Sequence, residues 1–200
     1  MGVLISGRGS NLQSIIDAIA RGHLAATIAV VISNRPDAQG LQRARDAGIE
    51  ALHVSPRDYP DRDRYDAAIV DALRKRDVHL VCLAGFMRLV GRPLLDAFPN
   101  RILNIHPSLL PSFPGLEAQR QALEHGVRVT GATVHLVTSE LDAGPIVLQA
   151  SVPVLADDTV DTLSARVLIE EHRLYPEAIR IVLDGGWCVD GRRFVRSRAS

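Results

Sequence analysis

The chain has 200 residues, 46% of them apolar, which is enough to bury one sizeable core, so a single domain is the first expectation. Its 23 basic and 23 acidic side chains cancel, and this argues against nucleic acid as a partner because no net field attracts a polyanion. Without a membrane-length apolar run or a charged leader, we expect a cytoplasmic protein that does not contact a membrane.

The first half alternates short apolar runs with amphipathic stretches. We expect strands over Val3–Ile5, Ile28–Ile32, Ala51–Val54, Leu80–Leu83 and Ile102–Ile105, and helices over Leu12–Ala20, Leu41–Ala47 and Tyr65–Leu73. This alternation predicts βαβ units. The fold class is therefore α/β, with a Rossmann-like, mostly parallel twisted sheet and helices on both faces.

A glycine-rich turn, Ser6–Leu12, joins the first expected strand to the first helix and includes Gly9, Ser10 and Asn11. Free N–H groups at a helix N-terminus favour an anion. The dinucleotide fingerprint fails because Leu12 replaces its third glycine, and no Walker sequence is present, so a phosphate monoester is the better ligand. The alternative is a tight turn in which Ser10 or Asn11 merely caps the helix.

The segment Asn104–Pro111 is the strongest chemical signal. Residues two apart on a strand project to the same face, so Asn104 and His106 should point together into the crevice at the strand's carboxyl end. Pro107 and Pro111 stiffen the loop that follows. The alternative is a core histidine whose ring is satisfied by a backbone carbonyl.

The second half should contain an antiparallel pair of longer strands, Val129–Val137 and Ile146–Val154, joined by a turn that contains Asp142. The position of Asp142 fits ordinary turn chemistry as well as a partnership with His106. His135 alternates with apolar neighbours and is interpreted as structural.

A late helix is expected to begin after Asp158 or Thr159, and Pro176 should kink or split it. Glu171 falls on the apolar stripe of this helix, where it could bind a ligand or pair with Arg166 or another arginine.

The chain's end predicts a hairpin around a DG turn at Asp190 and Gly191. Cys82 and Cys188 do not form a disulfide framework, and the absence of CxxC and HExxH patterns argues against a metal site.

Five blocks together resemble the folate-dependent phosphoribosylglycinamide formyltransferases, from Val3 to about Leu183. They are the segments 6–12, 84–88, 104–111, 140–145 and 171–176. The resemblance implies one formyltransferase domain over residues 1–200, with a phosphate-binding half (1–100), a catalytic and folate-binding half (101–184) and a tail of no assigned role (185–200).

The resemblance also implies the reaction: formyl transfer from 10-formyltetrahydrofolate, a co-substrate, to the amine of glycinamide ribonucleotide, without a metal. Asn104, His106 and Asp142 match the catalytic set, in which a protonated His106 and the Asn104 amide stabilise an oxyanion. The ribonucleotide contacts are Gly9, Ser10, Asn11 and Glu171. The folate contacts are Arg62, Met87, Arg88, Leu89, Val90 and Val137, the last in a loop against the pteridine.

Three alternatives remain beside this reading. A formyltetrahydrofolate hydrolase and a methionyl-tRNA formyltransferase share the Asn, His and Asp logic, but each carries an extra domain. A catalytically silent ribonucleotide- or folate-binding protein would retain the binding segments alone. The oligomeric state stays open, and a homodimer is compatible with the sequence.

Overall fold

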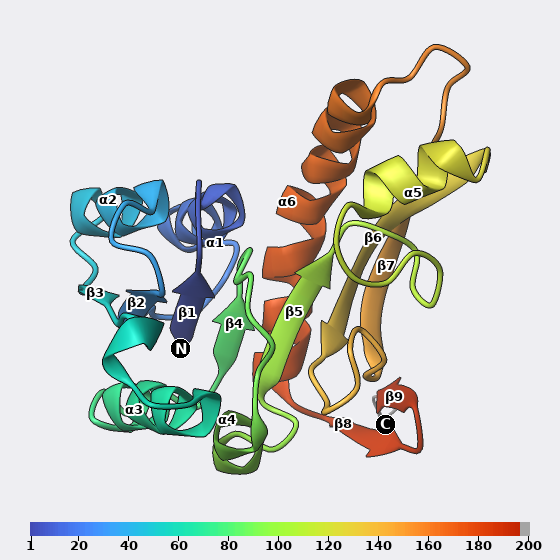
Figure 1. Cartoon of the computed structure of the whole chain (residues 1–200). Coiled ribbons are helices and arrows are strands. Elements are labelled where there is room, and N and C mark those ends of the chain that lie inside the picture. The colour runs from blue at the N-terminus through green and yellow to red at the C-terminus, as the bar shows by residue number, and fades with distance from the viewer. Residues whose placement is uncertain (197–200) are drawn as a thin grey trace. The chain divides into compact units, whose positions relative to one another are not determined.

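The computed structural model describes residues 1–196 (Figure 1). The chain divides into two compact units, Met1–Asn104 and Ile105–Ser200, and passes from one to the other within strand β5 (Ile102–His106). None of the helices within the described residues is both long and apolar enough to cross a membrane.

The first unit is built on a parallel sheet with the strand order β3-β2-β1-β4-β5. Its strands before β5 are β1 (Gly2–Ile5), β2 (Val30–Ser33), β3 (Ala51–His53) and β4 (Val81–Leu83). Its helices are α1 (Ser10–Ala20), α2 (Gln39–Asp46), α3 (Arg62–Arg74) and α4 (Arg92–Ala97), with a 3-10 turn, η1 (Pro56–Asp58). In Figure 1, α1 and α2 lie on one face of this sheet, and α3 and α4 lie on the other.

The central strands of this unit form its core because helices cover them on both sides. Val3, Leu4 and Ile5 of β1 are fully buried, as are Val81 and Cys82 of β4. Continuous apolar runs are typical of such strands, and they made the sheet predictable. The parallel α/β class is confirmed.

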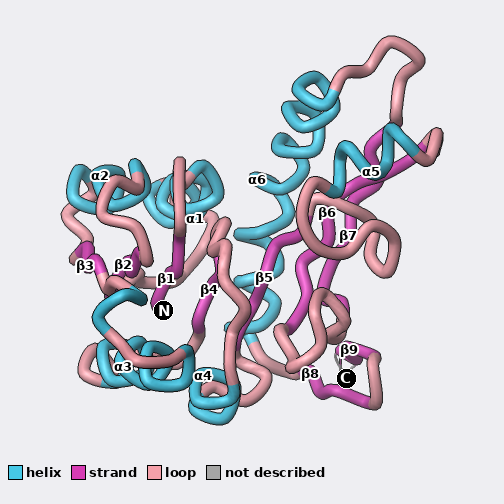
Figure 2. The backbone as a smooth tube through the Cα atoms, in the orientation of Figure 1, coloured by secondary structure: helices cyan, strands magenta, loops and turns pink. Residues whose placement is uncertain are grey.

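The second unit contains an antiparallel pair, β6 (Val129–Leu136) and β7 (Ile146–Pro153) (Figure 2). Helix α6 (Val160–Asp184) packs against both strands, and the shorter α5 (Ala118–Glu124) packs against α6. The predicted terminal hairpin is present as β8 (Trp187–Asp190) and β9 (Arg193–Arg196).

Helix α6 begins as predicted and runs unbroken to Asp184. The hydroxyl of Thr159 accepts the N–H of Thr162, whose own hydroxyl accepts the N–H of Thr159 in a capping box. Pro176 lies inside one continuous helix, so of the two expected effects, a kink or a split, the split is wrong. The neighbouring Tyr175 and Ala178 are fully buried, and this packing compensates for the hydrogen bond that proline cannot make.

Candidate active site

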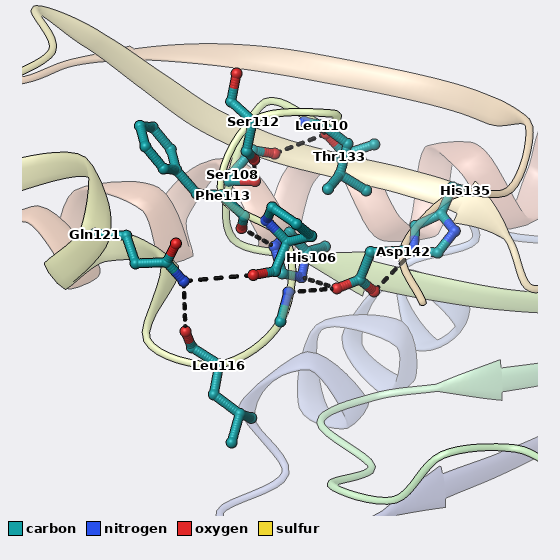
Figure 3. A network of polar contacts seen from close by, with 12 residues as sticks. His106, Ser108, Leu110, Ser112, Phe113, Leu116, Gln121, Thr133, His135 and Asp142 are labelled. Carbon is teal, nitrogen blue, oxygen red and sulfur yellow. Dashed lines mark hydrogen bonds and ion pairs between the residues drawn. The ribbon is translucent and has the colours of Figure 1, made fainter. Parts of the chain in front are cut away.

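Strand β5 places Asn104 and His106 two residues apart, and therefore on the same face of the strand. Asn104 is half-buried, and His106 is buried with 5% of its surface exposed. The loop after β5 is tied to β6: the hydroxyl of Thr133 donates to the carbonyl of Ser108 at 2.7 Å and accepts the N–H of Leu110 at 3.1 Å. This network holds the loop beside the histidine (Figure 3).

Both nitrogens of the His106 ring face an oxygen atom. Nε2 lies 2.9 Å from the carbonyl oxygen of Phe113, and because a carbonyl only accepts, Nε2 must carry a proton and donate. Nδ1 lies 3.4 Å from Oδ2 of Asp142. A neutral His106 therefore directs a lone pair towards the carboxyl group, whereas a second proton on Nδ1 would join the two groups in an ion pair.

Asp142 occupies the turn after β6 with a φ of 49°, in the left-handed region. Its Oδ2 accepts the N–H of Gly115 at 2.8 Å, and Gly115 itself has a φ of 82°, which glycine adopts without strain. The carboxyl group thus bridges the turn and the loop that follows β5. Asp142 is a turn residue, as one interpretation held, and it is also the partner of His106.

His135 is a second imidazole beside Asp142. Its Nδ1 donates to the carbonyl of Leu136 at 2.9 Å, and its Nε2 lies 3.7 Å from Oδ1 of Asp142 (Figure 3). The interpretation of His135 as merely structural missed this position. Apolar neighbours on an alternating strand show only that a residue is buried, whereas the approach to Asp142 depends on the turn between β6 and β7.

Burial and charge act on this cluster in opposite directions. Burial lowers the pKa of His106 below its ordinary value of 6.5, although the Phe113 carbonyl and the Asp142 carboxylate oppose that change. Burial raises the pKa of Asp142, but the neighbouring His135, the Gly115 N–H and His106 outweigh it and leave that pKa below its ordinary value. The site therefore disfavours protonation of His106 relative to a free imidazole and favours an ionised Asp142, and the imidazolium expected to stabilise the oxyanion stays a prediction.

The glycine-rich turn presents backbone N–H groups without side-chain competition. Gly9 is the N-cap of α1, with a φ of 70°, and no side chain caps this helix. The alternative in which Ser10 or Asn11 caps the helix is therefore wrong. A Cβ on Gly9 would lie 2.6 Å from the Cα of Gly40, so a larger residue could not fit. The turn is suited to an anion at the N-terminus of α1.

The predicted folate segment Met87–Val90 lies between β4 and α4. Met87 and Leu89 expose 67% and 58% of their surfaces, while Arg88 is half-buried. The hydroxyl of Ser6 accepts the N–H of Met87 at 2.8 Å and donates to Oδ1 of Asn34 at 2.6 Å. Ser6, the first residue of the glycine-rich turn, therefore connects this turn to the folate segment and to Asn34, directly after β2.

The remaining predicted contacts lie on α3, in the loop after β6, and on α6. Arg62 is exposed at the start of α3, and Val137 is half-buried directly after β6. Glu171 is buried on α6 with 8% exposed. Arg166 binds Asp158 through two contacts of 2.8 Å, so the Glu171–Arg166 pair considered from the sequence does not form. No group of three or more metal-ligating side chains converges anywhere in residues 1–196.

The sequence profile of the formyl transferase family matches residues 1–179. The chain belongs to this family. Among curated formyl transferase relatives, the phosphoribosylglycinamide formyltransferase of Escherichia coli strain K12 is 45% identical over 198 residues, which cover 99% of this chain and 91% of that protein.

The crystal structure of glycinamide ribonucleotide transformylase 1 from Symbiobacterium toebii shares the same formyl transferase fold. It is 61% identical, with a TM-score of 0.97, over 98% of this chain and 92% of that chain. The human trifunctional purine biosynthetic protein adenosine-3 is 48% identical over 183 residues, but the match covers only 18% of its length. The chain therefore corresponds to one formyl transferase portion of that longer protein.

Proposed function

We propose that this chain transfers the formyl group of 10-formyltetrahydrofolate to the amine of glycinamide ribonucleotide in purine biosynthesis. The observation that carries the proposal is the Asp142 carboxyl group 3.4 Å from Nδ1 of His106, on the strand that also presents Asn104. Family membership and extended similarity to proteins named for this reaction support it.

The three polar residues suit the chemistry of acyl transfer. The substrate amine attacks the formyl carbon, and negative charge develops on the formyl oxygen. The Asn104 amide stabilises this oxygen as a donor, and a protonated His106 stabilises it by its positive charge. Developing negative charge raises the pKa of His106 and so favours its protonation during the reaction.

Asp142 completes the proton balance of the reaction. The attacking nitrogen becomes positively charged and must lose a proton, while N10 of the departing tetrahydrofolate must gain one. The ionised Asp142 favours an imidazolium at His106 and accepts the amine proton directly or through water. The C–N bond to the ribonucleotide forms, and the bond to N10 breaks, with no net change in oxidation state.

The binding residues divide by ligand. Gly9, Ser10 and Asn11 hold the ribonucleotide phosphate through backbone N–H groups, and Glu171 binds another part of the ribonucleotide. The folate contacts are Arg62, Met87, Arg88, Leu89, Val90 and Val137. One domain over residues 1–200, the cytoplasmic location and a homodimer remain predictions from the sequence.

The decisive experiment combines the protein with 10-formyltetrahydrofolate and follows the release of tetrahydrofolate with and without glycinamide ribonucleotide. We expect release only when the ribonucleotide is present, with stoichiometric formylglycinamide ribonucleotide. Release that does not depend on the ribonucleotide would indicate a hydrolase. Binding of both ligands without product would indicate a silent binding protein.

A further inference from the structure

A buried carboxyl group lies beside the proposed folate segment, on a residue that belongs to none of the sequence motifs. Asp66, on α3, exposes only 2% of its surface. An acidic side chain is rarely buried unless a compensating partner lies nearby, because it loses its hydration. The partners of Asp66 therefore indicate why this position carries an acid.

The first partner is the backbone directly after the folate segment. Oδ2 of Asp66 accepts the N–H of Gly91 at 2.6 Å. A Cβ on Gly91 would lie 2.7 Å from that oxygen and 3.2 Å from both Nε of Arg62 and Oδ1 of Asp63, so the arginine lies close to two carboxyl groups, of which Asp66 is the buried one. Asp66 thus anchors the backbone that follows the folate segment and lies near Arg62, another proposed folate contact.

The second partner is Arg88, whose guanidinium lies 4.9 Å from the ring centre of Tyr65. Burial raises the pKa of Asp66, and the neighbouring Asp63 adds to that rise. The Gly91 N–H and the positive charges of Arg62 and Arg88 oppose it, so the carboxyl group lies within electrostatic range of both arginines. The Tyr65 ring therefore lies against the Arg88 guanidinium, the charge of Asp66 acts on it, and its buried Nε has no hydrogen-bond partner among the described residues.

We propose that Asp66 is a positioning residue that holds Arg62 and Arg88 in place for the carboxylates of the folate's glutamate tail. The inference rests on the proposed folate site. Glutamate carboxylates are the anionic part of a folate, and guanidinium groups bind carboxylates in two-point contacts. The positive charges of Arg62 and Arg88 repel each other, and a buried negative charge on which both act reduces that repulsion without touching the ligand.

A substrate that lacks the tail tests this role. The Michaelis constants are measured for 10-formyltetrahydrofolate and for 10-formyltetrahydropteroate, which has no glutamate, in the wild-type protein and in Asp66→Asn and Asp66→Ala. Asparagine keeps an oxygen for the Gly91 N–H and removes the charge. The matched control is Asp71→Asn, an exposed acid on the same helix.

We expect Asp66→Asn to raise KM for the glutamate-bearing substrate by roughly tenfold, the factor equivalent to about 1.4 kcal/mol. Its kcat, its KM for the ribonucleotide and its KM for the tailless substrate should change by less than a few-fold, and Asp71→Asn should match the wild type. Asp66→Ala should show the same selectivity and also a lower Tm, because it loses the Gly91 contact. Equal KM changes for both folate forms, or a fall in kcat at unchanged KM, would overturn the proposal.

Direct binding separates this inference from the proposed reaction. Calorimetric titration with tetrahydrofolate and tetrahydropteroate requires no turnover, so it measures the glutamate preference even if the wild-type protein transfers no formyl group. A wild-type preference that disappears in Asp66→Asn supports the role of Asp66 in either case. An unchanged preference in a folded variant, verified by circular dichroism, contradicts it.

Discussion

The carboxyl group of Asp142 lies between two imidazoles, and each imidazole donates through its other nitrogen to a backbone carbonyl, of Phe113 or Leu136. Each carbonyl only accepts, so the ring nitrogen that faces it carries a proton. Any additional proton in the cluster therefore lies on a nitrogen that faces Asp142 or on Asp142 itself. Burial lowers the pKa of His106 and the Asp142 carboxylate opposes that change, so the protonation of these two groups is linked.

The first prediction concerns turnover. Asp142→Asn and His106→Ala should lower kcat by roughly 10²- to 10⁴-fold, the range for loss of a general acid or base, with much smaller changes in substrate affinity. Steady-state kinetics and ligand titration on the purified variants measure the two effects separately. Wild-type turnover in either variant is incompatible with the proposed roles.

The second prediction concerns pH and stability. Because burial lowers the pKa of His106, the unfolded chain binds this proton more readily, and the contribution of His106 to stability falls as the pH drops below about 6.5. The lowered pKa of Asp142 adds a loss in the same direction at more acidic pH. The free energy of unfolding in urea should therefore fall more steeply from about pH 7.5 to about pH 5 in the wild type than in His106→Asn. Parallel pH profiles would contradict this assignment.

The end of β1 is a junction between the loops that follow β1, β2 and β4. The buried Ser6 follows β1 and bonds to Asn34, directly after β2, and to Met87, in the segment after β4. Adjacent parallel strands bring these three loops to one edge of the sheet. One hydroxyl group therefore helps to shape both the glycine-rich turn and the folate segment.

The third prediction tests this junction. Ser6→Ala should lower the free energy of unfolding by about 1–3 kcal/mol, because the N–H of Met87 and the amide oxygen of Asn34 both lose their partner. Chemical denaturation measures the change. Ser14→Ala is the control, since that hydroxyl donates only to the carbonyl of Asn11 in its own helix and its loss should cost less. Equal stability of Ser6→Ala and the wild type would exclude the role of the junction.

Elements with a strong local signal were the most predictable from the sequence. The buried apolar runs indicated the parallel strands, and Thr159 marked the start of α6. The spacing of Asn104 and His106 placed them on one face of a strand. In contrast, the contacts that reveal His135 and Asp66 depend on the fold. His135 contacts Asp142 in the turn after β6, and Asp66 accepts a hydrogen bond from Gly91. The prediction of a split at Pro176 was wrong because local propensity takes no account of the packing around α6.

The C-terminal hairpin lies beyond the residues that match the family profile. The profile match ends at residue 179, whereas ordered structure continues through the β8–β9 hairpin to Arg196. Within the second unit, the hairpin contacts α6 and β7. Nε1 of Trp187 donates to the carbonyl of Val182 on α6 at 3.0 Å, and Arg193 pairs with Ile146 of β7.

The fourth prediction follows from this attachment. Deletion of residues 186–200 should lower Tm, by about 2–4 °C for each kcal/mol of lost contact, because the hairpin packs against folded elements. Ribonucleotide-dependent release of tetrahydrofolate should stay within a few-fold of the full chain, since no proposed site residue lies in the hairpin. Calorimetry and the release assay measure the two quantities. A folded but inactive truncated protein would assign the hairpin a role in the reaction.

Trp187 is the one tryptophan in the sequence, and its ring stacks on Phe194 with centroids 4.9 Å apart. The intrinsic fluorescence of this protein above the tyrosine emission band therefore comes entirely from the hairpin. Detachment of β8 from α6 would expose the indole to water and shift its emission to longer wavelengths. The chain thus contains a built-in optical reporter for its C-terminal region, readable without a label during titration with either substrate.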